Sequence, residues 1–300
     1  RLFRGAGVRG LSAIPEQRSE GQAILLRPLL NTSRQDLRIS AIEAELEWIE
    51  DPSNEDTNYD RNYIRAKVLP SIVERWPAAK TTLVRASANL ASTAALLDEY
   101  GDDLLLRCDW REARWGWSFE IEGFKSLSSA AQTHLLSTAF RETDLSGFDS
   151  AYLGKVRSLL TSAQAKAPLL MAGDSELRRF ANRLYLMPQI KPLAAGHVEI
   201  SWNGKDSLQI PGCGRLKAIE GYDGSVSTVG LRVGGERCKP TGRDHSQSIK
   251  KLMQEYELEP WLRDRTPLVW QGDEILAVPG LFSCKTDLAS PAFEWDLRAD

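Results

Sequence analysis

The sequence is poor in the residues that build covalent or metal cross-links. Its four cysteines (Cys108, Cys213, Cys238 and Cys284) are far apart and form no CxxC pair, and it has only three histidines. This scatter argues against a disulfide scaffold and against a zinc site, whose ligands recur at short spacings. We therefore expect reduced, partly buried thiols and no metal ligands in this chain.

Long apolar runs are also missing. No stretch approaches the roughly 18 to 20 residues that a membrane-spanning helix needs, and the first residues lack the pattern of a signal peptide. We expect a cytoplasmic protein with no membrane partner. Because the chain opens on Arg1 rather than on Met, we also expect it to be a piece of a longer protein.

An overall excess of positive charge is absent, since the formal net charge is −3. The charge is uneven, however: residues 1–38 hold seven arginines against three acids, and residues 231–251 hold six basic residues against two acids. Local basic patches bind phosphates whatever the global sum, so composition leaves RNA binding open. A length of 300 residues with 42% hydrophobic content predicts two or three globular domains.

The first ten residues, RLFRGAGVRG, contain Gly5-x-Gly7-x-x-Gly10. A dinucleotide fingerprint needs a strand before this pattern and a helix after it, and the LSAIP that follows is a poor helix start. A nicotinamide-binding oxidoreductase is thus a weak alternative. The segment is either a glycine-rich turn for close backbone packing or a loop near a nucleotide.

Residues 24–49 predict a strand, a helix and a strand. Residues 24–30 form an apolar run with Pro28 at an edge position, Thr32 or Ser33 caps a helix over 34–45, and Trp48-Ile49 is a second short strand. This order is typical of the end of an α/β domain.

The charge of the side chains changes from negative to positive within residues 39–65. Eight acids and no Lys or Arg occupy residues 39–60, and Arg61, Asn62 and Arg65 follow at once. The acidic loop suits a cationic group such as an ammonium, or it is a solvated face. Arg61 and Arg65 share a helix face if residues 62–70 are helical, where they could clamp phosphates or pair with the acidic loop.

The region from about 85 to 190 is predicted to be mostly helical, with a hairpin. Leucines recur every seven residues from Leu83 to Leu104 in a long helix that begins at Pro77, and helices follow at 127–140 and 152–160. A hairpin is expected over 110–121, and strands at 169–171 and 184–187 flank a Gly173 turn. Three arginines nearby are either RNA contacts or surface charges: Arg178, Arg179 and Arg183.

After a linker at 188–196 the pattern becomes strand-like, at 197–202, 207–210, 215–219 and 227–233. Asn203-Gly204 between two of these strands predicts a tight hairpin turn. The closing module has a helix capped by Ser246, with Lys250 and Lys251 facing outward, and then two strands around Gly272.

The WIEDPSN…RNxxR stretch at 48–65, the RGxGxxGL segment and the closing GGE…GR…KK…PWxRxxxPL sequence resemble the bacterial tRNA(Ile)-lysidine synthetases. The resemblance covers the whole chain. It implies a multidomain α/β and α+β protein: the end of a PP-loop ATP-pyrophosphatase domain at 1–80, a mainly helical tRNA-binding or linking domain at 81–190, and a small β-rich α+β tRNA-binding domain at 191–300. The family's SGGxDS and HxxDDxxET-type motifs are not in these residues.

The same resemblance implies an ATP-dependent carbon–nitrogen ligase that attaches L-lysine to the wobble cytidine, position 34, of a CAU-anticodon tRNA(Ile), so that it reads AUA. ATP and magnesium would bind mainly through the missing front part, and this chain would be the tRNA-binding portion, inactive alone. A homodimer is possible. The alternative is a non-catalytic tRNA-binding protein that lacks the ATP domain.

The resemblance also implies residue roles. Arg61, Glu50 and Asp51 are the candidate catalytic residues. Residues expected near ATP or substrate are Arg4, Gly5, Gly7, Asn54, Asn62 and Arg65. The candidate tRNA contacts are basic residues of the closing module and one indole for stacking: Arg232, Arg237, Lys239, Arg243, Lys250, Lys251, Trp261, Arg263 and Arg265.

Overall fold

The computed structural model describes residues 5–12, 14–20, 23–149, 151–161, 168–193, 199–219, 227–284 and 293–298. The chain divides into two compact units, Arg1–Tyr100 and Gly101–Asp300. Among the described residues, no helix combines the length and the apolar character needed to cross a membrane.

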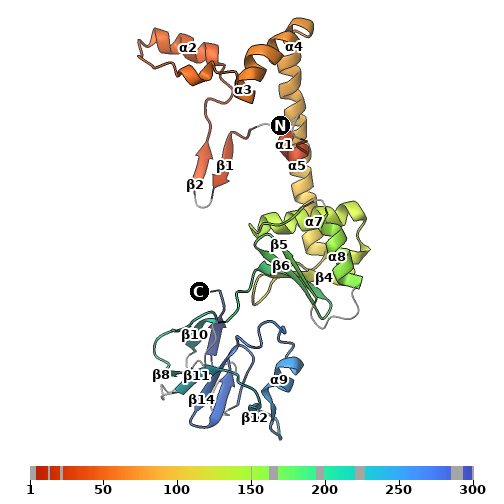
Figure 1. Cartoon of the computed structure of the whole chain (residues 1–300), viewed down its shortest axis with the longest axis vertical. Helices are drawn as coiled ribbons and strands as arrows, with labels where there is room; N and C mark the ends of the chain where they lie inside the picture. The colour runs from red at the N-terminus through yellow and green to blue at the C-terminus, as the bar shows by residue number, and fades with distance from the viewer. Residues whose placement is uncertain are drawn as a thin grey trace. The chain divides into compact units, whose positions relative to one another are not determined.

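The first unit is built from short elements (Figure 1). They are α1 (Val8–Leu11), the hairpin β1 (Gln17–Glu20) with β2 (Ala23–Leu26), α2 (Arg34–Glu43), the 3-10 turn η2 (Pro52–Asn54), α3 (Asp60–Tyr63), the π-helix η3 (Ile64–Val68), α4 (Leu69–Arg75) and the start of α5 (Ala79–Arg107). Ser33 caps α2 by accepting a hydrogen bond from the Asp36 N–H, as predicted. The expected strand at Trp48-Ile49 is wrong, because this segment pairs with no described strand.

This unit has almost no interior of its own. Among its described residues only Asn62 and Ala94 are buried, whereas apolar side chains such as Ile24 on β2 and Ile42 on α2 are about 60% exposed. Its short elements are therefore held by caps and ion pairs rather than by a shared core, and short helices gain little stability that way.

The long helix α5 begins at Ala79, two residues after Pro77. Its heptad leucines do not form one uniform packing stripe: Leu83 is exposed, whereas Leu104 is fully buried. Helix α5 packs closely against helix α7 at Gly101. A Cβ at this position would lie 2.3 Å from the Thr138 hydroxyl. The absence of a side chain lets α5 approach helix α7 closely.

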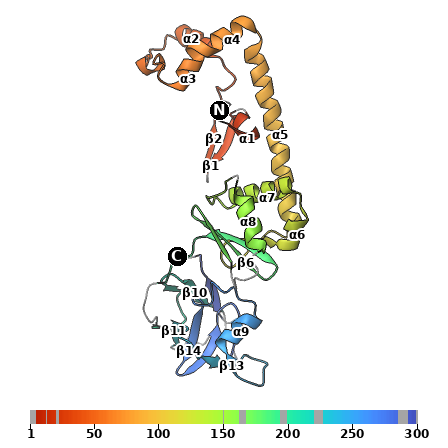
Figure 2. The same cartoon turned by 45° about the vertical axis from the view of Figure 1, so that its right-hand side comes forward.

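The second unit begins with a helix-covered sheet (Figures 1 and 2). The sheet is antiparallel in the order β3-β4-β7-β6-β5, from β3 (Arg111–Glu112), β4 (Trp117–Glu120), β5 (Leu169–Ala172), β6 (Ser175–Phe180) and β7 (Arg183–Pro188). The predicted hairpin over 110–121 is confirmed as β3–β4. Strand β6 was not predicted, because its Arg178-Arg179 pair hides the alternation of a strand.

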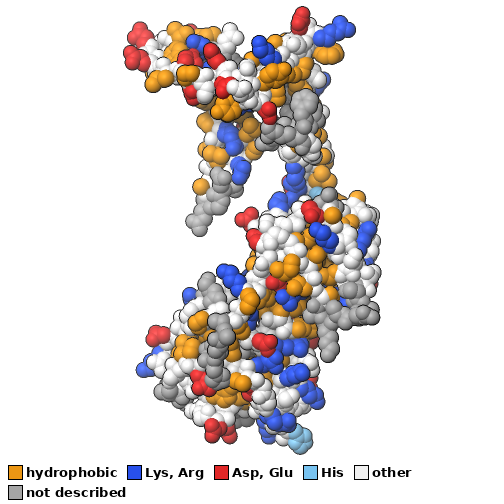
Figure 3. Space-filling view, in the orientation of Figure 1, with side chains coloured by type: hydrophobic (Ala, Val, Ile, Leu, Met, Phe, Trp, Pro, Cys, Tyr) orange, Lys and Arg blue, Asp and Glu red, His pale blue; other side chains and the backbone are white. Residues whose placement is uncertain are grey.

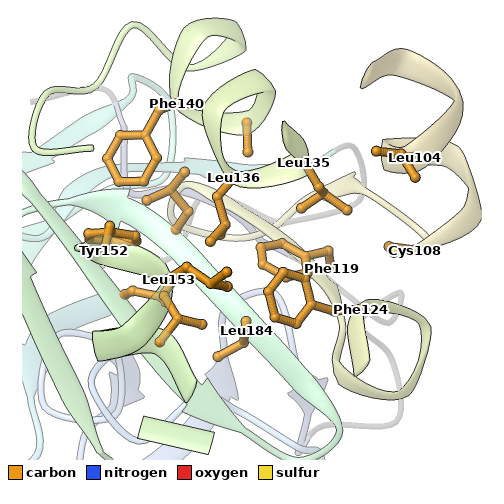
Figure 4. Close-up of a cluster of buried hydrophobic side chains, with 14 of the residues drawn as sticks. Leu104, Cys108, Phe119, Phe124, Leu135, Leu136, Phe140, Tyr152, Leu153 and Leu184 are labelled. Atoms are coloured by element: carbon orange, nitrogen blue, oxygen red, sulfur yellow. The ribbon is translucent and has the colours of Figure 1, made fainter. Parts of the chain in front are cut away.

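Helices α6 (Ile121–Ser126), α7 (Ser129–Glu142) and α8 (Tyr152–Thr161) enclose the main core with this sheet. Figure 4 shows Phe119 from β4, Phe124 from α6 and Leu184 from β7 pointing toward one another. Phe140 meets Tyr152 edge-on with ring centroids 5.1 Å apart, a geometry that aromatic quadrupoles favour. The two predicted helices are confirmed within about two residues.

The β-rich remainder holds a five-stranded sheet, β16-β15-β14-β11-β8, and a three-stranded sheet, β17-β10-β9. Their strands are β8 (Glu199–Trp202), β9 (Leu208–Ile210), β10 (Gly214–Ala218), β11 (Ser227–Leu231), β14 (Pro267–Gln271), β15 (Glu274–Val278), β16 (Phe282–Ser283) and β17 (Phe293–Asp296). A small ribbon, β12 (Arg237–Cys238) with β13 (Gln247–Ser248), precedes helix α9 (Ile249–Glu255).

Two local predictions in this part are corrected. Because β8 pairs with β11 and β9 with β10, the Asn203-Gly204 turn links two sheets and closes no hairpin between its flanking strands. Ser248, not Ser246, caps α9 by accepting from the Lys251 N–H. Ile249, Leu252 and Met253 are buried there, whereas Lys250 and Lys251 are exposed, as predicted.

Arg183 should be the most sensitive polar residue of the helix-covered sheet. Its guanidinium is buried and donates to the Ser118 hydroxyl and carbonyl, each at 3.0 Å, and to Asp109. Arg183→Met removes the donor to the buried Ser118 and weakens the pairing of Asp109, so we expect a loss of about 2 kcal/mol in the free energy of unfolding, measured by urea denaturation. The matched control is Arg111→Met. Arg111 is exposed and its guanidinium lies 3.7 Å from the Asp109 carboxylate, so its loss should change the free energy of unfolding little. Equal effects of both variants would contradict this role.

Candidate functional site

Glu50 is the first acid of the predicted catalytic loop, and it is anchored to α2. Arg34 and Arg38 approach its carboxylate at 3.4 and 3.2 Å, and the Trp48 indole N–H donates to it at 3.2 Å. The Arg38 guanidinium lies 5.9 Å from the centre of the Trp48 ring. Glu50 thus fixes the start of the loop while about half of its side chain stays exposed.

Asp51 caps the 3-10 turn η2 by accepting from the Ser53 N–H at 2.9 Å. Hydrogen bonds from the Ser53 backbone and hydroxyl, with a smaller contribution from the Arg61 charge, hold the pKa of Asp51 below its usual value. A carboxyl whose pKa is lowered by folding stabilises the fold above its unfolded pKa and loses this effect as pH falls through the folded pKa. The cap is therefore intact at neutral pH.

Asn62 is the buried centre of this loop. Its side chain is 3% exposed, and its amide donates to the carbonyls of Ser53 and Asp56 at 2.9 and 3.0 Å. One side chain thus ties the loop that holds Asn54 to helix α3. Its role as an ATP-proximal residue stays a prediction, while its structural role follows directly from these contacts.

Arg61 and Arg65, which come next in the chain, are both exposed. Arg61 lies 5.8 Å from the Tyr59 ring centre, and Arg65 lies within the π-helix η3 and pairs with no acid among the described residues. A π-helical turn is rare and often marks a functional site. The structure therefore brings Asp51, Asn62 and Arg61 together and leaves both guanidinium groups accessible.

The glycine-rich segment at the start of the chain makes few contacts that could define a binding site. Gly5 has φ +70° and Gly7 precedes the four-residue helix α1, with open space where a Cβ would lie at either position. Arg4 lies outside the described residues. The expected place of Gly5 and Gly7 near ATP stays a prediction. In the described parts of the chain, no group of three or more His, Cys, Asp or Glu side chains could hold a metal ion.

The basic residues of the closing module fall into two classes. Figure 3 shows Lys and Arg side chains gathered around α9 and β12. Lys239, Lys250 and Lys251 are exposed there, with only a 3.8 Å approach of Lys251 to Glu255. The arginines are engaged: Arg232 pairs with Asp264, Arg243 pairs with Glu255 at 2.6 Å, and Arg237 donates to the Ser246 carbonyl.

A loop of positive-φ glycines stands beside these cations. Gly234 and Gly235 have φ +116° and +94°, and Val233 next to them is 74% exposed. Glu236 accepts hydrogen bonds from the Val233 and Gly234 N–H groups. Although burial opposes ionisation, these bonds and the Arg232 charge hold the pKa of Glu236 below its usual value, so an ionised carboxylate shapes the loop.

Three other predicted tRNA contacts have structural partners. Trp261 lies edge-on to Tyr185, at 5.1 Å between ring centres, and Arg178 lies 5.4 Å over its indole ring. Arg263 donates twice to the Leu258 carbonyl. Arg265 is only 8% exposed and donates to the carbonyls of Gly212 and Lys191. Trp261 thus has aromatic and cationic partners within the second unit, and its role in stacking on a base stays a prediction.

Contacts between the two halves of the second unit were missed by sequence reasoning. The β3–β4 turn reaches the closing module through Arg114, which pairs with buried Glu259 at 2.9 Å, and through Arg298, which pairs with Glu112. The Trp115 indole N–H donates to the Pro188 carbonyl at 3.1 Å. Partners 73 to 186 residues apart leave no local pattern in a sequence.

Comparison with protein families places three models along the chain. A PP-loop domain matches residues 1–72, a TilS substrate binding domain matches 119–185, and a TilS substrate C-terminal domain matches 227–298. The last match contains α9 and its exposed lysines.

Curated relatives match almost the full chain. A tRNA(Ile)-lysidine synthase of Coxiella burnetii is 36% identical over 95% of this chain and 64% of that protein. Proteins of the same name from Methylococcus capsulatus and Vibrio atlanticus are 35% and 34% identical over 93% and 94% of this chain, and over 65% and 67% of their own lengths. The chain thus spans just under two thirds of the first two relatives.

We expect Asn62→Ala to loosen the loop at 51–60 without unfolding the second unit. Because two carbonyls lose their only side-chain donor, amide hydrogen exchange across residues 53–62 should become roughly tenfold faster, as read by mass spectrometry. Asn58→Ala, which removes an exposed amide from the same loop, is the control. Unchanged exchange in Asn62→Ala would show that the loop is held by other contacts.

Proposed function

Because this chain belongs to the tRNA(Ile)-lysidine synthase family, we propose that it is the tRNA-facing part of an ATP-dependent carbon–nitrogen ligase. The substrates are L-lysine and a CAU-anticodon tRNA(Ile), whose wobble cytidine 34 receives the lysine and then directs reading of AUA. The observation that carries the proposal is the order of three family models along the chain, each over a matching part of the fold.

We propose different roles for the three domains at 1–80, 81–190 and 191–300. The first belongs to the catalytic domain, and the other two hold the tRNA. Support comes from the exposed cations around α9, because such side chains bind a phosphate backbone without reading sequence. The helix-covered sheet is the second RNA-facing part, supported by its family match.

In the acidic loop, we assign a positioning role to Glu50 and Asp51. Their carboxylates suit the ammonium group of a lysine substrate, since opposite charges attract, and both side chains are exposed to an incoming cation. Arg61 and Arg65 present guanidinium groups to the phosphates of a substrate, a geometry that suits bidentate contacts.

ATP would supply the energy for activating the cytidine, with magnesium as its counter-ion. The described residues do not fit magnesium, because none of their groups of His, Cys, Asp or Glu side chains could hold a metal ion. We expect this chain to be inactive alone.

The first test is a filter-binding titration of the chain with unmodified CAU-anticodon tRNA(Ile), beside tRNA(Met), across a salt series. We expect preferential, salt-sensitive binding of tRNA(Ile) and no ATP-dependent incorporation of labelled lysine. Equal or absent binding would contradict the assignment of tRNA recognition to these domains. Turnover by this chain alone would contradict the placement of the ATP site.

The second test addresses the lysines of α9. Changing both Lys250 and Lys251 to Ala should weaken tRNA binding and reduce the slope of log K against log salt by about 1 to 2. The double change to Arg keeps both charges and should keep the slope. A slope unchanged in the Ala variant would show that these lysines do not contact phosphates.

A further inference from the structure

A half-enclosed cavity lies where the helix-covered sheet meets the β-rich part of the second unit. Its volume is about 320 Å³. Trp115, Pro188, Ile190 and Leu297 form apolar walls, and Gly212 and Arg265 also line it. The walls belong to segments separated by as many as 182 residues, so the cavity exists only in the folded unit.

The residues that line the cavity are held in place by hydrogen bonds. Residues 189–192, expected to be a linker, are held by hydrogen bonds: the Gln189 N–H donates to the Asp174 carbonyl at 3.0 Å, and the Ile190 N–H donates to the buried Glu176 carboxylate at 2.8 Å. The Trp115 indole is fixed by its bond to Pro188. A pre-formed wall loses little entropy when a ligand binds.

Arg265 is the unusual member of this lining. The residue is only 8% exposed, yet among the described residues its guanidinium donates only to the carbonyls of Gly212 and Lys191 and meets no carboxylate. A guanidinium has five N–H donors, and a buried charge is normally paired. The cavity therefore combines an uncompensated cation with apolar walls that include an indole.

We propose that this cavity binds a mononucleotide unit, with its phosphate on Arg265 and its base against Trp115. The charge requires an anion, the indole and proline walls suit a flat ring, and the volume suits one nucleotide. The choice of a nucleotide over another aromatic anion rests on the proposed function, in which RNA and ATP are substrates. The nucleotide comes either from the RNA or from solution.

Titration calorimetry of the 300-residue chain with AMP tests the proposal. We expect one site per chain, and binding at least about tenfold weaker for adenosine and for inorganic phosphate, because each lacks one of the two contacts. Absence of saturable AMP binding overturns the proposal. A chain that binds tRNA(Ile) but not AMP overturns this inference alone, whereas a chain that binds AMP but no tRNA overturns the proposed function alone.

Two variants locate the site. Ile190→Trp fills the cavity from a partly exposed wall, and Arg265→Met removes the cation; each should abolish AMP binding. Because Arg265 also holds two carbonyls, Ile190→Trp is the decisive variant. Lys205→Ala is the control, since Lys205 is exposed on the β8–β9 turn and is not among the residues that line the cavity. AMP binding that persists in Ile190→Trp overturns the proposal.

A competition experiment identifies the source of the nucleotide. If saturating AMP weakens tRNA binding by the wild type but not by Ile190→Trp, the cavity takes a nucleotide of the RNA. If tRNA binding is indifferent to AMP in both proteins, it takes a free nucleotide.

Discussion

The contact of Trp261 with the β6–β7 face makes the second unit one body. Its ring meets Tyr185 and Phe180 edge-on, and Arg178 covers it from another side. Nearby, Arg114 pairs with Glu259, and Arg298 fastens the β3–β4 turn to the C-terminal strand β17. Because aromatic contacts and ion pairs join both halves, the helix-covered sheet and the β-rich part keep a fixed spacing.

The first unit has the opposite character. Its described residues lack a common core, and its acidic loop is organised by single contacts: the Ser33 and Asp51 caps, the anchoring of Glu50 and the buried Asn62 amide. Regions held by few contacts open at low free energy. The loop therefore opens more readily than the packed second unit.

The degree to which sequence predicted the site differs from residue to residue. Lys250 and Lys251 were placed correctly on an exposed helix face, because α9 has regular apolar spacing. Trp261 and Arg265 were expected to face RNA because they lie among basic residues, yet both have structural partners. Their burial depends on Tyr185 and on the carbonyls of Gly212 and Lys191, whose distance along the chain no local pattern reports.

The sequence by itself determined the family, the hairpin over 110–121, the helices near 127–140 and 152–160, and a helix cap at Thr32 or Ser33, since these depend on local spacing and on short-range hydrogen bonds. Only the tertiary structure decided which arginines are free and which are engaged, that the Asn203-Gly204 turn links two sheets, and that a buried cation lines an apolar cavity. The physical reason is that charge pairing and cavity walls are made by residues far apart in the chain, and their meeting is fixed by packing.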